Sequence, residues 1–380
     1  MKFINYGVCA PLGFLASGIS CGIKNKRNNK DLALIYSQIP AVSAGMFTTN
    51  TFKAAPIRIS KRNLFNSKAQ AIIANSGNAN CFTGICGINY AQRMSQACAK
   101  ELSINAKDVL VASTGIIAKP LPIIKIEKHV PGLVKVLSRQ GGRSAAEAIL
   151  TTDSFLKQAA VEFKIGKSKT RIGAIAKGAG MIAPNMSTML CFITTDAKIK
   201  PLALKQALRD AVGNSFNNIT IDGCMSTNDT VFIMANGLCG NKEINLKDKN
   251  SAVFSQALSV ICDKMSKAIV RDAEGATKFI RIKIEGASSD YIAREIGLSV
   301  ANSNLFKTAV YGENPNWGRI IAAVGSLGLN IREKAIKIKF SSFKSSDVTI
   351  DIGLSMGRGR AKIYTSDLTP KYIKINAEYN

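Results

Sequence analysis

The apolar segments of this 380-residue chain follow two patterns, which together limit the folds it can adopt. Residues 69–77 (AQAIIANSG) and 109–114 (VLVAST) are short, continuous apolar runs that end in small polar residues, as strands buried on both faces do. Residues 279–285 (FIRIKIE) and 334–340 (KAIKIKF) alternate apolar and charged side chains, which predicts strands with one face in water. The chain therefore combines fully buried and half-exposed strands.

Helical segments lie between these strands. A capping box, Ser144 to Glu147, predicts a helix that ends near residues 151–152. Pro201 predicts the start of a second helix, and residues 251–270 carry apolar side chains at helical spacing. Because helices and strands alternate without a strict strand–helix–strand rhythm, we expect a mixed α/β (α+β) sandwich.

The half-exposed strands gather after residue 275, and this change of pattern predicts two domains. We expect a catalytic sandwich domain over residues 1–240, to which residues 346–380 return, and a smaller α/β domain over residues 241–345. The segment GLSMGRGRAK (353–362) lies between strand-like segments and predicts a hairpin turn rather than a phosphate-binding loop.

The net charge of +26 comes from 51 Lys and Arg against 25 Asp and Glu, and such an excess can mark a nucleic-acid-binding protein. Here the basic residues are spread along strands and helices rather than gathered in a tail, so nucleic acid is an unlikely partner. The same positive charge could attract small anionic substrates, and this would need no further sequence motif. A basic nucleic-acid-binding protein stays open as an alternative.

The nine cysteines contain no C-x-x-C motif, and their odd number indicates reduced thiols in a cytoplasmic protein. With a single histidine, His129, we expect no metal site and no Ser-His-Asp triad. No apolar run is long enough to span a membrane, and Pro11 and three glycines interrupt the N-terminal apolar stretch.

A nucleophile that carries its own base remains available to this chain. Residues 177–197 (KGAGMIAPNMSTMLCFITTDA) join a Gly- and Pro-containing turn to a dense apolar run, and Ser187-Thr188 lies at the junction. If the chain is cut before Thr188, its new α-amine has a pKa of about 8 and can accept the hydroxyl proton. The cut would begin with attack of Thr188 Oγ on the Ser187 carbonyl. The alternative is an ordinary loop that leads into a buried strand.

Two further stretches fit such a site. VLVASTGII ends a strand in Thr114-Gly115, where a hydroxyl and an amide could form an oxyanion hole, although an ordinary turn is the alternative. Glu274 lies beside a glycine in DAEGATKF, where its carboxylate could hold a substrate ammonium or could simply be solvated.

Ten segments of the chain closely resemble the ornithine acetyltransferase family, the glutamate N-acetyltransferases of arginine biosynthesis, in the order of that family. The likeness covers nearly the whole chain. The segments are GFLASGISCGIK, DLALIYSQIPAVSAGMFTTN, IIANSGNANCFTG, VLVASTGIIAKPLP, AAEAILTTDSF, KGAGMIAPNMSTMLCFITTDA, STNDTVFIMANG, DAEGATKF, GENPNWGRIIAAVGSLG and YIKINAEY.

The resemblance implies a fold like that of autoprocessing aminopeptidases, with two β layers between helices. It implies cleavage between Ser187 and Thr188 into chains 1–187 and 188–380, with Thr188 as nucleophile and Thr114 with Gly115 as oxyanion hole. The substrate contacts that it implies are Thr151 (or its neighbour Thr152), Lys177, Thr188, Glu274 and Asn376.

The implied reaction moves an acetyl group from N2-acetylornithine to Thr188 and then to glutamate, which gives ornithine and N-acetylglutamate. No cofactor is implied, and acetyl-CoA stays open as a second acetyl donor. The two cleaved chains would pair into an α2β2 heterotetramer. Within the same fold, an autoprocessed aminopeptidase or amidase would use water as acceptor, but those relatives carry a serine nucleophile.

The sequence departs from the family pattern at a few positions. Ser187 stands where alanine is usual before the cut, and its small size predicts that cleavage survives. Cys224-Met225 replaces Asp-Thr, and Asn314 replaces an aspartate. The family pattern ends one residue later on a Ser or Thr that contacts substrate, whereas Asn380 is last here, so we expect an altered substrate affinity.

Overall fold

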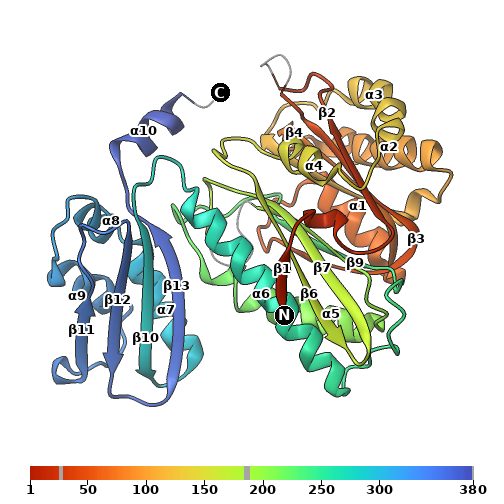
Figure 1. Ribbon diagram of the computed structural model, residues 1–380. Helices are drawn as coiled ribbons and strands as arrows, with labels where there is room; N and C mark the ends of the chain where they lie inside the picture. The colour runs from red at the N-terminus through yellow and green to blue at the C-terminus, as the bar shows by residue number, and fades with distance from the viewer. Residues whose placement is uncertain (25–28, 184–188, 379–380) are drawn as a thin grey trace. The chain divides into compact units, whose positions relative to one another are not determined.

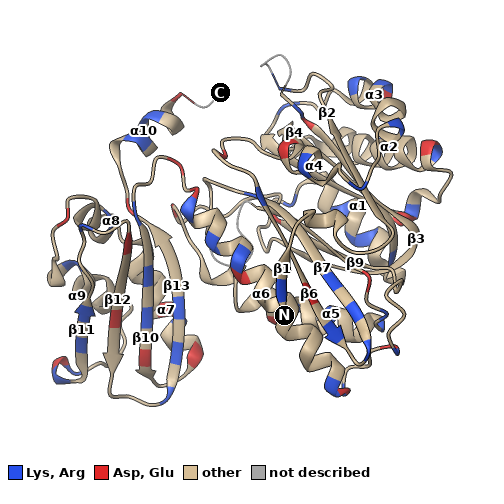
Figure 2. Ribbon diagram, in the orientation of Figure 1, with Lys and Arg blue, Asp and Glu red and all other residues tan. Residues whose placement is uncertain are grey.

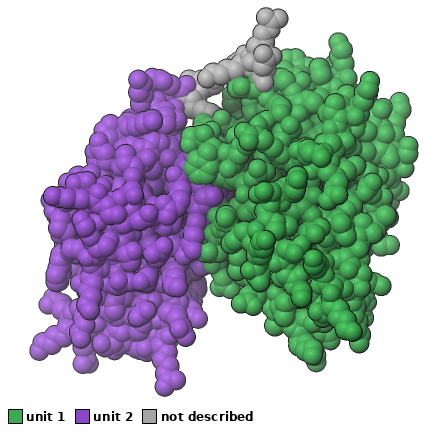
Figure 3. Space-filling view, viewed as in Figure 1, with its two compact units in different colours: residues 1–178, 188–215, 226–265 green, residues 179–187, 216–225, 266–380 purple. Residues whose placement is uncertain are grey.

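The computed structural model describes residues 1–24, 29–183 and 189–378. The chain divides into two compact units, coloured separately in Figure 3. Unit 1 comprises residues 1–178, 188–215 and 226–265, and unit 2 comprises residues 179–187, 216–225 and 266–380.

Within the described residues, nine strands form the sheet of unit 1 (Figure 1). Eight of them follow the order β1-β6-β7-β8-β9-β3-β4-β5, and β2 pairs with β3. The strands are β1 (Lys2–Ile4), β2 (Phe14–Ile19), β3 (Leu32–Phe47), β4 (Lys68–Asn78), β5 (Val109–Ile116), β6 (Lys157–Ile165), β7 (Ser168–Lys177), β8 (Leu190–Thr195) and β9 (Thr230–Ala235).

Strand β3 folds this sheet into two layers. Its first part pairs with β2 and β4, its register with β4 shifts between Tyr36 and Ala41, and its last part pairs with β9. One face of β3, β4 and β5 packs against helices, while the other packs against apolar side chains of β7, β8 and β9, such as Phe192 and Phe232. Strands buried on both faces explain the continuous apolar runs in the sequence.

Helices cover both outer faces of unit 1. Helices α1, α2 and α3 share a core with β3, β4 and β5, whereas Cys191 of β8 lies beside Cys262 of α6 on the other side. The expected helix–sheet–sheet–helix sandwich is thereby confirmed. The helices are α1 (Ala55–Asn63), α2 (Gly84–Leu102), α3 (Ile123–Lys135), α4 (Gly142–Ala148), α5 (Pro201–Gly213) and α6 (Lys249–Arg271).

Unit 2 has a four-stranded sheet in its described residues, in the order β11-β12-β10-β13. One face packs on α7, α8 and α9, and the other carries charged side chains such as the Lys283–Asp351 ion pair at 3.1 Å. Figure 2 shows that Lys, Arg, Asp and Glu residues recur along these strands. The elements are β10 (Phe279–Ala287), β11 (Ile336–Phe340), β12 (Asp347–Leu354), β13 (Gly359–Ser366), α7 (Asp290–Asn302), α8 (Asn304–Tyr311), α9 (Trp317–Gly325) and α10 (Pro370–Ala377).

The expected domain boundaries of 1–240 and 241–345 are wrong. Residues 346–380 do not return to the larger unit, because β12 and β13 both pair with β10 in the smaller one. Helix α6 begins in unit 1 and ends in unit 2, so the division falls near residue 265. Since β10 lies between β12 and β13, the glycine-rich 353–362 segment is not the turn of a hairpin.

The helices predicted near Pro201 and over residues 251–270 form, whereas the predicted capping box does not. The helices at Pro201 and at residues 251–270 are confirmed, but α4 begins at Gly142, so Ser144 lies inside it and caps nothing. The side chains of Ser144 and Glu147 instead accept hydrogen bonds from Lys30. The nine cysteines are free thiols, and six of them are buried. None of the helices described combines the length and hydropathy that crossing a membrane requires.

Candidate active site

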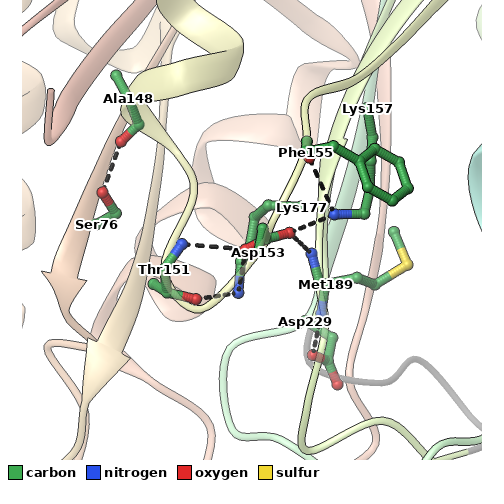
Figure 4. A network of polar contacts seen from close by, with 10 residues as sticks. Ser76, Ala148, Thr151, Asp153, Phe155, Lys157, Lys177, Met189 and Asp229 are labelled. Carbon is green, nitrogen blue, oxygen red and sulfur yellow. Dashed lines mark hydrogen bonds and ion pairs between the residues drawn. The ribbon is translucent and has the colours of Figure 1, made fainter. Parts of the chain in front are cut away.

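Lys177 ends β7 and is the centre of a buried polar cluster in unit 1 (Figure 4). Only 2% of the residue is exposed. Its Nζ donates a hydrogen bond to Thr151 Oγ1 at 2.7 Å and lies 3.7 Å from Asp153 Oδ2. Of the two threonines considered from the sequence, the fold thus brings Thr151 to Lys177.

Asp153 connects the elements of this cluster. Its carboxylate accepts hydrogen bonds from Lys157 Nζ at 2.7 Å, from the Gly178 amide at 2.7 Å and from the Thr151 amide at 3.0 Å. The side chains of Asp153, Lys157 and Lys177 are at most 3% exposed. Burial alone would raise the pKa of Asp153, but the charges of Lys177 and Lys157 outweigh it and hold that pKa below its usual range.

The loop that carries Thr151 and Asp153 leaves the end of α4, and a buried hydrogen bond fixes this end. Ser76 of β4 donates its hydroxyl to the Ala148 carbonyl at 2.6 Å. Among the described side chains of the cluster, two lysines face one aspartate, which leaves an excess of positive charge. A substrate carboxylate is the natural counter-ion for such a charge.

The start of β8 lies directly beside this cluster. Leu190 pairs with Lys177 on one side and with Thr230 on the other, and the Met189 amide donates to Asp229 Oδ1 at 2.9 Å. The predicted nucleophile Thr188 and its neighbour Ser187 lie outside the described residues. Since Met189 follows Thr188, this hydrogen bond fixes the chain immediately after the predicted nucleophile.

Asp229 is fully buried. Burial raises the pKa of its carboxyl well above the usual value, and the Met189 amide and the charge of Lys177 oppose this only in part. The raised pKa favours the uncharged carboxyl. Asp229 therefore offsets the charge of Lys177 less than an ordinary aspartate would.

The adjacent residue, Asn228, links this region to the end of β5. Its Nδ2 donates to the Ala79 carbonyl at 2.6 Å and to the Ser113 carbonyl at 2.8 Å. Thr114 follows Ser113 and is 3% exposed. One amide side chain thus connects the strand of the predicted oxyanion residues to the segment that holds Met189.

Gly115 has a conformation that only glycine tolerates here. Its φ is +132°, and a Cβ at this position would lie 2.3 Å from the backbone carbon of Gly77. The backbone of β4 at Gly77 therefore occupies the space that a Cβ at Gly115 would need. Any larger side chain at Gly115 would push the strands apart beside Thr114.

Glu274 and Asn376 come together in unit 2. Asn376 Nδ2 donates to Glu274 Oε2 at 2.8 Å, and the Glu274 amide donates to the Ala179 carbonyl at 2.9 Å. A Cβ at Gly180 would lie 2.3 Å from Glu274 Oε2, so glycine leaves room for the carboxylate. Glu274 is partly buried and Asn376 is exposed.

The fold therefore gathers the predicted residues into two groups, one in each unit. Thr151, Lys177, Thr114 and Gly115 belong to unit 1, and Glu274 and Asn376 belong to unit 2. Sequence reasoning missed the residues that hold the first group together, Asp153, Lys157, Asn228 and Asp229. The signal of Asp153, Asn228 and Asp229 was an acid or amide within a short polar segment beside a buried strand, as in TTDSF and STNDT. Lys157 gave no such signal.

A model of the ArgJ family matches residues 15–345. The arginine biosynthesis bifunctional protein ArgJ of Dehalococcoides mccartyi is 44% identical over 393 residues, 98% of this chain and 96% of that protein. Its counterpart in Symbiobacterium thermophilum is 41% identical over 400 residues, 100% of both chains. The solved ornithine acetyltransferase of Mycobacterium tuberculosis, complexed with ornithine, is 37% identical over 48% of this chain and 97% of that chain, with a TM-score of 0.45.

The family model covers most of the chain, and the curated relatives align along its full length. The family resemblance of the sequence is confirmed by both findings. The chain therefore belongs to the ArgJ family, whose curated members are named arginine biosynthesis bifunctional proteins, and it is an acyltransferase of that pathway.

Proposed function

We propose that this acyltransferase cuts its own chain between Ser187 and Thr188 and then uses Thr188 to move an acetyl group from N2-acetylornithine to glutamate. One chain of hydrogen bonds carries the proposal. The Met189 amide bonds to Asp229, and the adjacent Asn228 bonds to the Ser113 carbonyl. Met189, which follows Thr188, and Ser113, which precedes Thr114, are thus both hydrogen-bonded to the segment Asn228-Asp229.

Cleavage starts when Thr188 Oγ attacks the Ser187 carbonyl carbon. The bond from that carbon to the Thr188 nitrogen breaks, the nitrogen takes up a proton, and an ester remains on Oγ. Water hydrolyses the ester and leaves a carboxylate on Ser187 and a free amine on Thr188. This amine has a pKa of about 8 when unperturbed, so a useful fraction is uncharged at neutral pH.

Transfer then takes two steps. The Thr188 amine accepts the hydroxyl proton while Oγ attacks the acetyl carbonyl of N2-acetylornithine; the carbon–nitrogen bond breaks and ornithine leaves with the proton. The amine of glutamate attacks the acetyl ester, which releases N-acetylglutamate and restores the Thr188 hydroxyl. The Thr114 hydroxyl and the Gly115 amide donate to the oxyanion in both steps.

The charged groups have matching substrate partners in this proposal. Lys177, with Thr151 beside it, binds a substrate carboxylate, because the cluster around Asp153 keeps a net positive charge. Glu274, oriented by Asn376, binds a substrate ammonium. Substitution of Lys177 by Met should raise the KM for both substrates, and unchanged KM values would remove Lys177 from the proposal.

The cut would leave the two chains held together by sheet pairing. Strand β7 precedes the cut and pairs with β8 after it over six residue pairs, and β3 pairs with β9 in the same way. We propose that the chains 1–187 and 188–380 stay associated and that two such pairs form an α2β2 heterotetramer. Native mass spectrometry would detect this assembly, and a lone αβ pair would contradict it.

The decisive experiment is denaturing mass spectrometry of the purified protein together with an acetyl-transfer assay. The wild type should give two fragments that meet at Ser187 and Thr188, and Thr188→Ser should give the same fragments more slowly. Thr188→Ala should stay intact and transfer no acetyl group. An intact wild-type chain, or acetyl transfer by Thr188→Ala, would overturn the proposal.

The acceptor separates this proposal from an amidase of the same fold. Ornithine release should depend on glutamate once one acetyl group per active site has been transferred. Continued release of ornithine and free acetate without glutamate would identify water as the acceptor and an amidase as the activity.

A further inference from the structure

Lys24 ends the segment GFLASGISCGIK, and the proposed reaction gives it no role. The side chain belongs to unit 1 and is partly buried. Its Nζ donates a hydrogen bond to the Lys30 carbonyl at 2.7 Å, and in the described part of the chain no carboxylate forms an ion pair with it. Since a lysine ammonium has three donors, this cation can still bind an anionic ligand.

A fully buried aspartate, Asp31, fixes the backbone that carries Lys24. Its carboxylate accepts hydrogen bonds from the amides of Cys21 at 2.6 Å, Ile23 at 2.6 Å and Lys24 at 3.1 Å. The Asp31 carbonyl accepts from the Ser76 amide at 2.9 Å, which connects the 21–24 turn to β4. Hydrogen bonds to a carboxylate are strong, so the turn holds Lys24 in a defined place.

The stem of Lys24 lies against the strand that pairs with the predicted oxyanion strand. A Cβ at Gly77 of β4 would lie 3.1 Å from Lys24 Cγ, and the φ of Gly77 is +97°. Gly77 pairs with Gly115 of β5. Glycine at position 77 therefore leaves room for the lysine stem directly beside the backbone that faces Gly115.

The 21–24 turn also lies beside helix α4, from which the Thr151 loop leaves. Ser76, which bonds to Asp31, donates its hydroxyl to the Ala148 carbonyl at the end of α4 (Figure 4). Lys30 Nζ donates to Glu147 of the same helix at 2.7 Å. Two hydrogen bonds thus connect the turn of Lys24 with the helix that positions Thr151.

The charge of Lys24 interacts with the charges of the Lys177 cluster. Burial lowers the pKa of Lys24 to about 8, and the charge of Lys177 lowers it further. The carboxylates of Asp31 and Asp153 oppose these effects only in part. The other charged groups on the elements packed around the turn are Lys125 of α3 and the ion pair of Lys30 with Glu147.

We propose that Lys24 binds the second carboxylate of glutamate and so helps to select the acetyl acceptor. This inference rests on the proposed function, in which Lys177 binds one carboxylate of either substrate. N2-acetylornithine carries one carboxylate and glutamate carries two, so the acceptor needs one more cation than the donor. Lys157 is already paired with Asp153, whereas Lys24 has no carboxylate in ion-pair contact among the described residues.

Steady-state acetyl transfer tests the proposal, because in a two-step transfer kcat/KM for each substrate reports its own half-reaction. Lys24→Met keeps the apolar stem and removes the charge. The kcat/KM for glutamate should fall about tenfold or more, as expected for a lost hydrogen bond to a charged group, while that for N2-acetylornithine stays the same. Lys24→Arg should restore most of the loss. Lys205→Met makes the same charge change on exposed α5 and should alter neither value.

The pH supplies a second readout. Lys24 is charged below its pKa of about 8 and loses its charge above it, whereas an arginine stays charged. The kcat/KM for glutamate of the wild type should therefore fall relative to that of Lys24→Arg as the pH rises through about 8. Titration of the Thr188 amine and of glutamate affects both enzymes and cancels in this ratio. A ratio independent of pH would overturn the proposal, even if Lys24→Met did not fold.

Binding of glutarate separates this inference from the proposed function. Glutarate has two carboxylates and no amine, so its Kd does not depend on acetyl transfer. Lys24→Met should bind glutarate more weakly than the wild type, and both should bind butyrate, which has one carboxylate, alike. An unchanged Kd for glutarate, or equal losses of kcat/KM for both substrates, would overturn the role of Lys24 alone. A wild type that binds glutarate through Lys24 but transfers no acetyl group would overturn the proposed function alone.

Discussion

The two groups of predicted site residues differ in burial and in how they hold charge. In unit 1, Asp153 lies between Lys157 and Lys177, and all three side chains are excluded from water. In unit 2, Glu274 is partly buried and its partner Asn376 is exposed. Buried charges depend on each other because water cannot replace a lost partner, whereas exposed groups can be solvated again. The unit 1 group should therefore stabilise the fold as well as form part of the site. Substitutions in the unit 2 group should change the stability less.

Removal of the Asp153 charge should give the largest effect. Asp153→Asn removes the carboxylate that pairs with Lys157 and lies beside Lys177, and removal of one partner from a buried pair costs about 3–5 kcal/mol. Urea unfolding should show this loss of stability. The surface pair of Lys283 and Asp351 supplies the control, since Asp351→Asn should cost less than about 1 kcal/mol. Equal losses at the two positions would contradict the comparison.

The shifted pKa of Asp153 also predicts how the stability depends on pH. The pKa of Asp153 is lower in the folded protein than in the unfolded chain, so its stabilising contribution is present above the unfolded pKa of about 4 and is lost as the pH falls below it. The difference in unfolding free energy between the wild type and Asp153→Asn should shrink between about pH 4 and pH 2. A constant difference would show that the charge of Asp153 is not what stabilises the cluster.

Thr114→Val should affect catalysis more than stability. It removes one proposed oxyanion donor, and such a loss lowers kcat by about a hundred- to a thousandfold. The neighbouring Ser113 provides a control, because its hydroxyl bonds to Asn75 rather than to the proposed oxyanion. Ser113→Ala should cost about 1 kcal/mol of stability with little change in kcat. Equal losses of kcat in the two variants would remove the oxyanion role from Thr114.

Glu274→Gln tests the more exposed group. Loss of a hydrogen bond to a charged group costs about 1.5–3 kcal/mol, so the KM for the substrate whose ammonium Glu274 binds should rise roughly tenfold or more. The melting temperature should change little, because water reaches this carboxylate. Glu285→Gln, an exposed change in the same unit, should leave both quantities unchanged. A large drop in stability for Glu274→Gln would mean that the two groups do not differ as described.

The sequence predicted individual strands better than it predicted which strands pair with each other. Continuous apolar runs predicted β4 and β5, and the alternating run 279–285 predicted β10. Burial of a strand on one or two faces determines its local pattern of apolar residues, so the sequence alone reveals it. The pattern does not state which sheet a strand joins. Strand β12 pairs in parallel with β10 some seventy residues earlier, and this distant pairing assigns 346–380 to unit 2.

The residues of the site were likewise predictable only in part. Thr114 could be named because it ends the apolar run of residues 109–114, and Lys177 because it begins a segment that resembles the family. Asp153 and Lys157 lie four residues apart in a segment whose local sequence does not indicate burial, and only the fold encloses them with Lys177. Asp229 lies in a polar segment whose burial depends on the packing of β8 against β9.

The smallest effect should come from Asn376→Ala. Asn376 donates one amide hydrogen bond to Glu274 from an exposed position, where water can replace it, so the KM for the same substrate should rise only a few fold. Because Asn376 acts by orienting Glu274, its effect should nearly vanish in the Glu274→Gln background. Additive losses in the double variant would mean that Asn376 contacts substrate directly. The exposed group would then consist of two independent contacts, unlike the mutually dependent charges around Asp153.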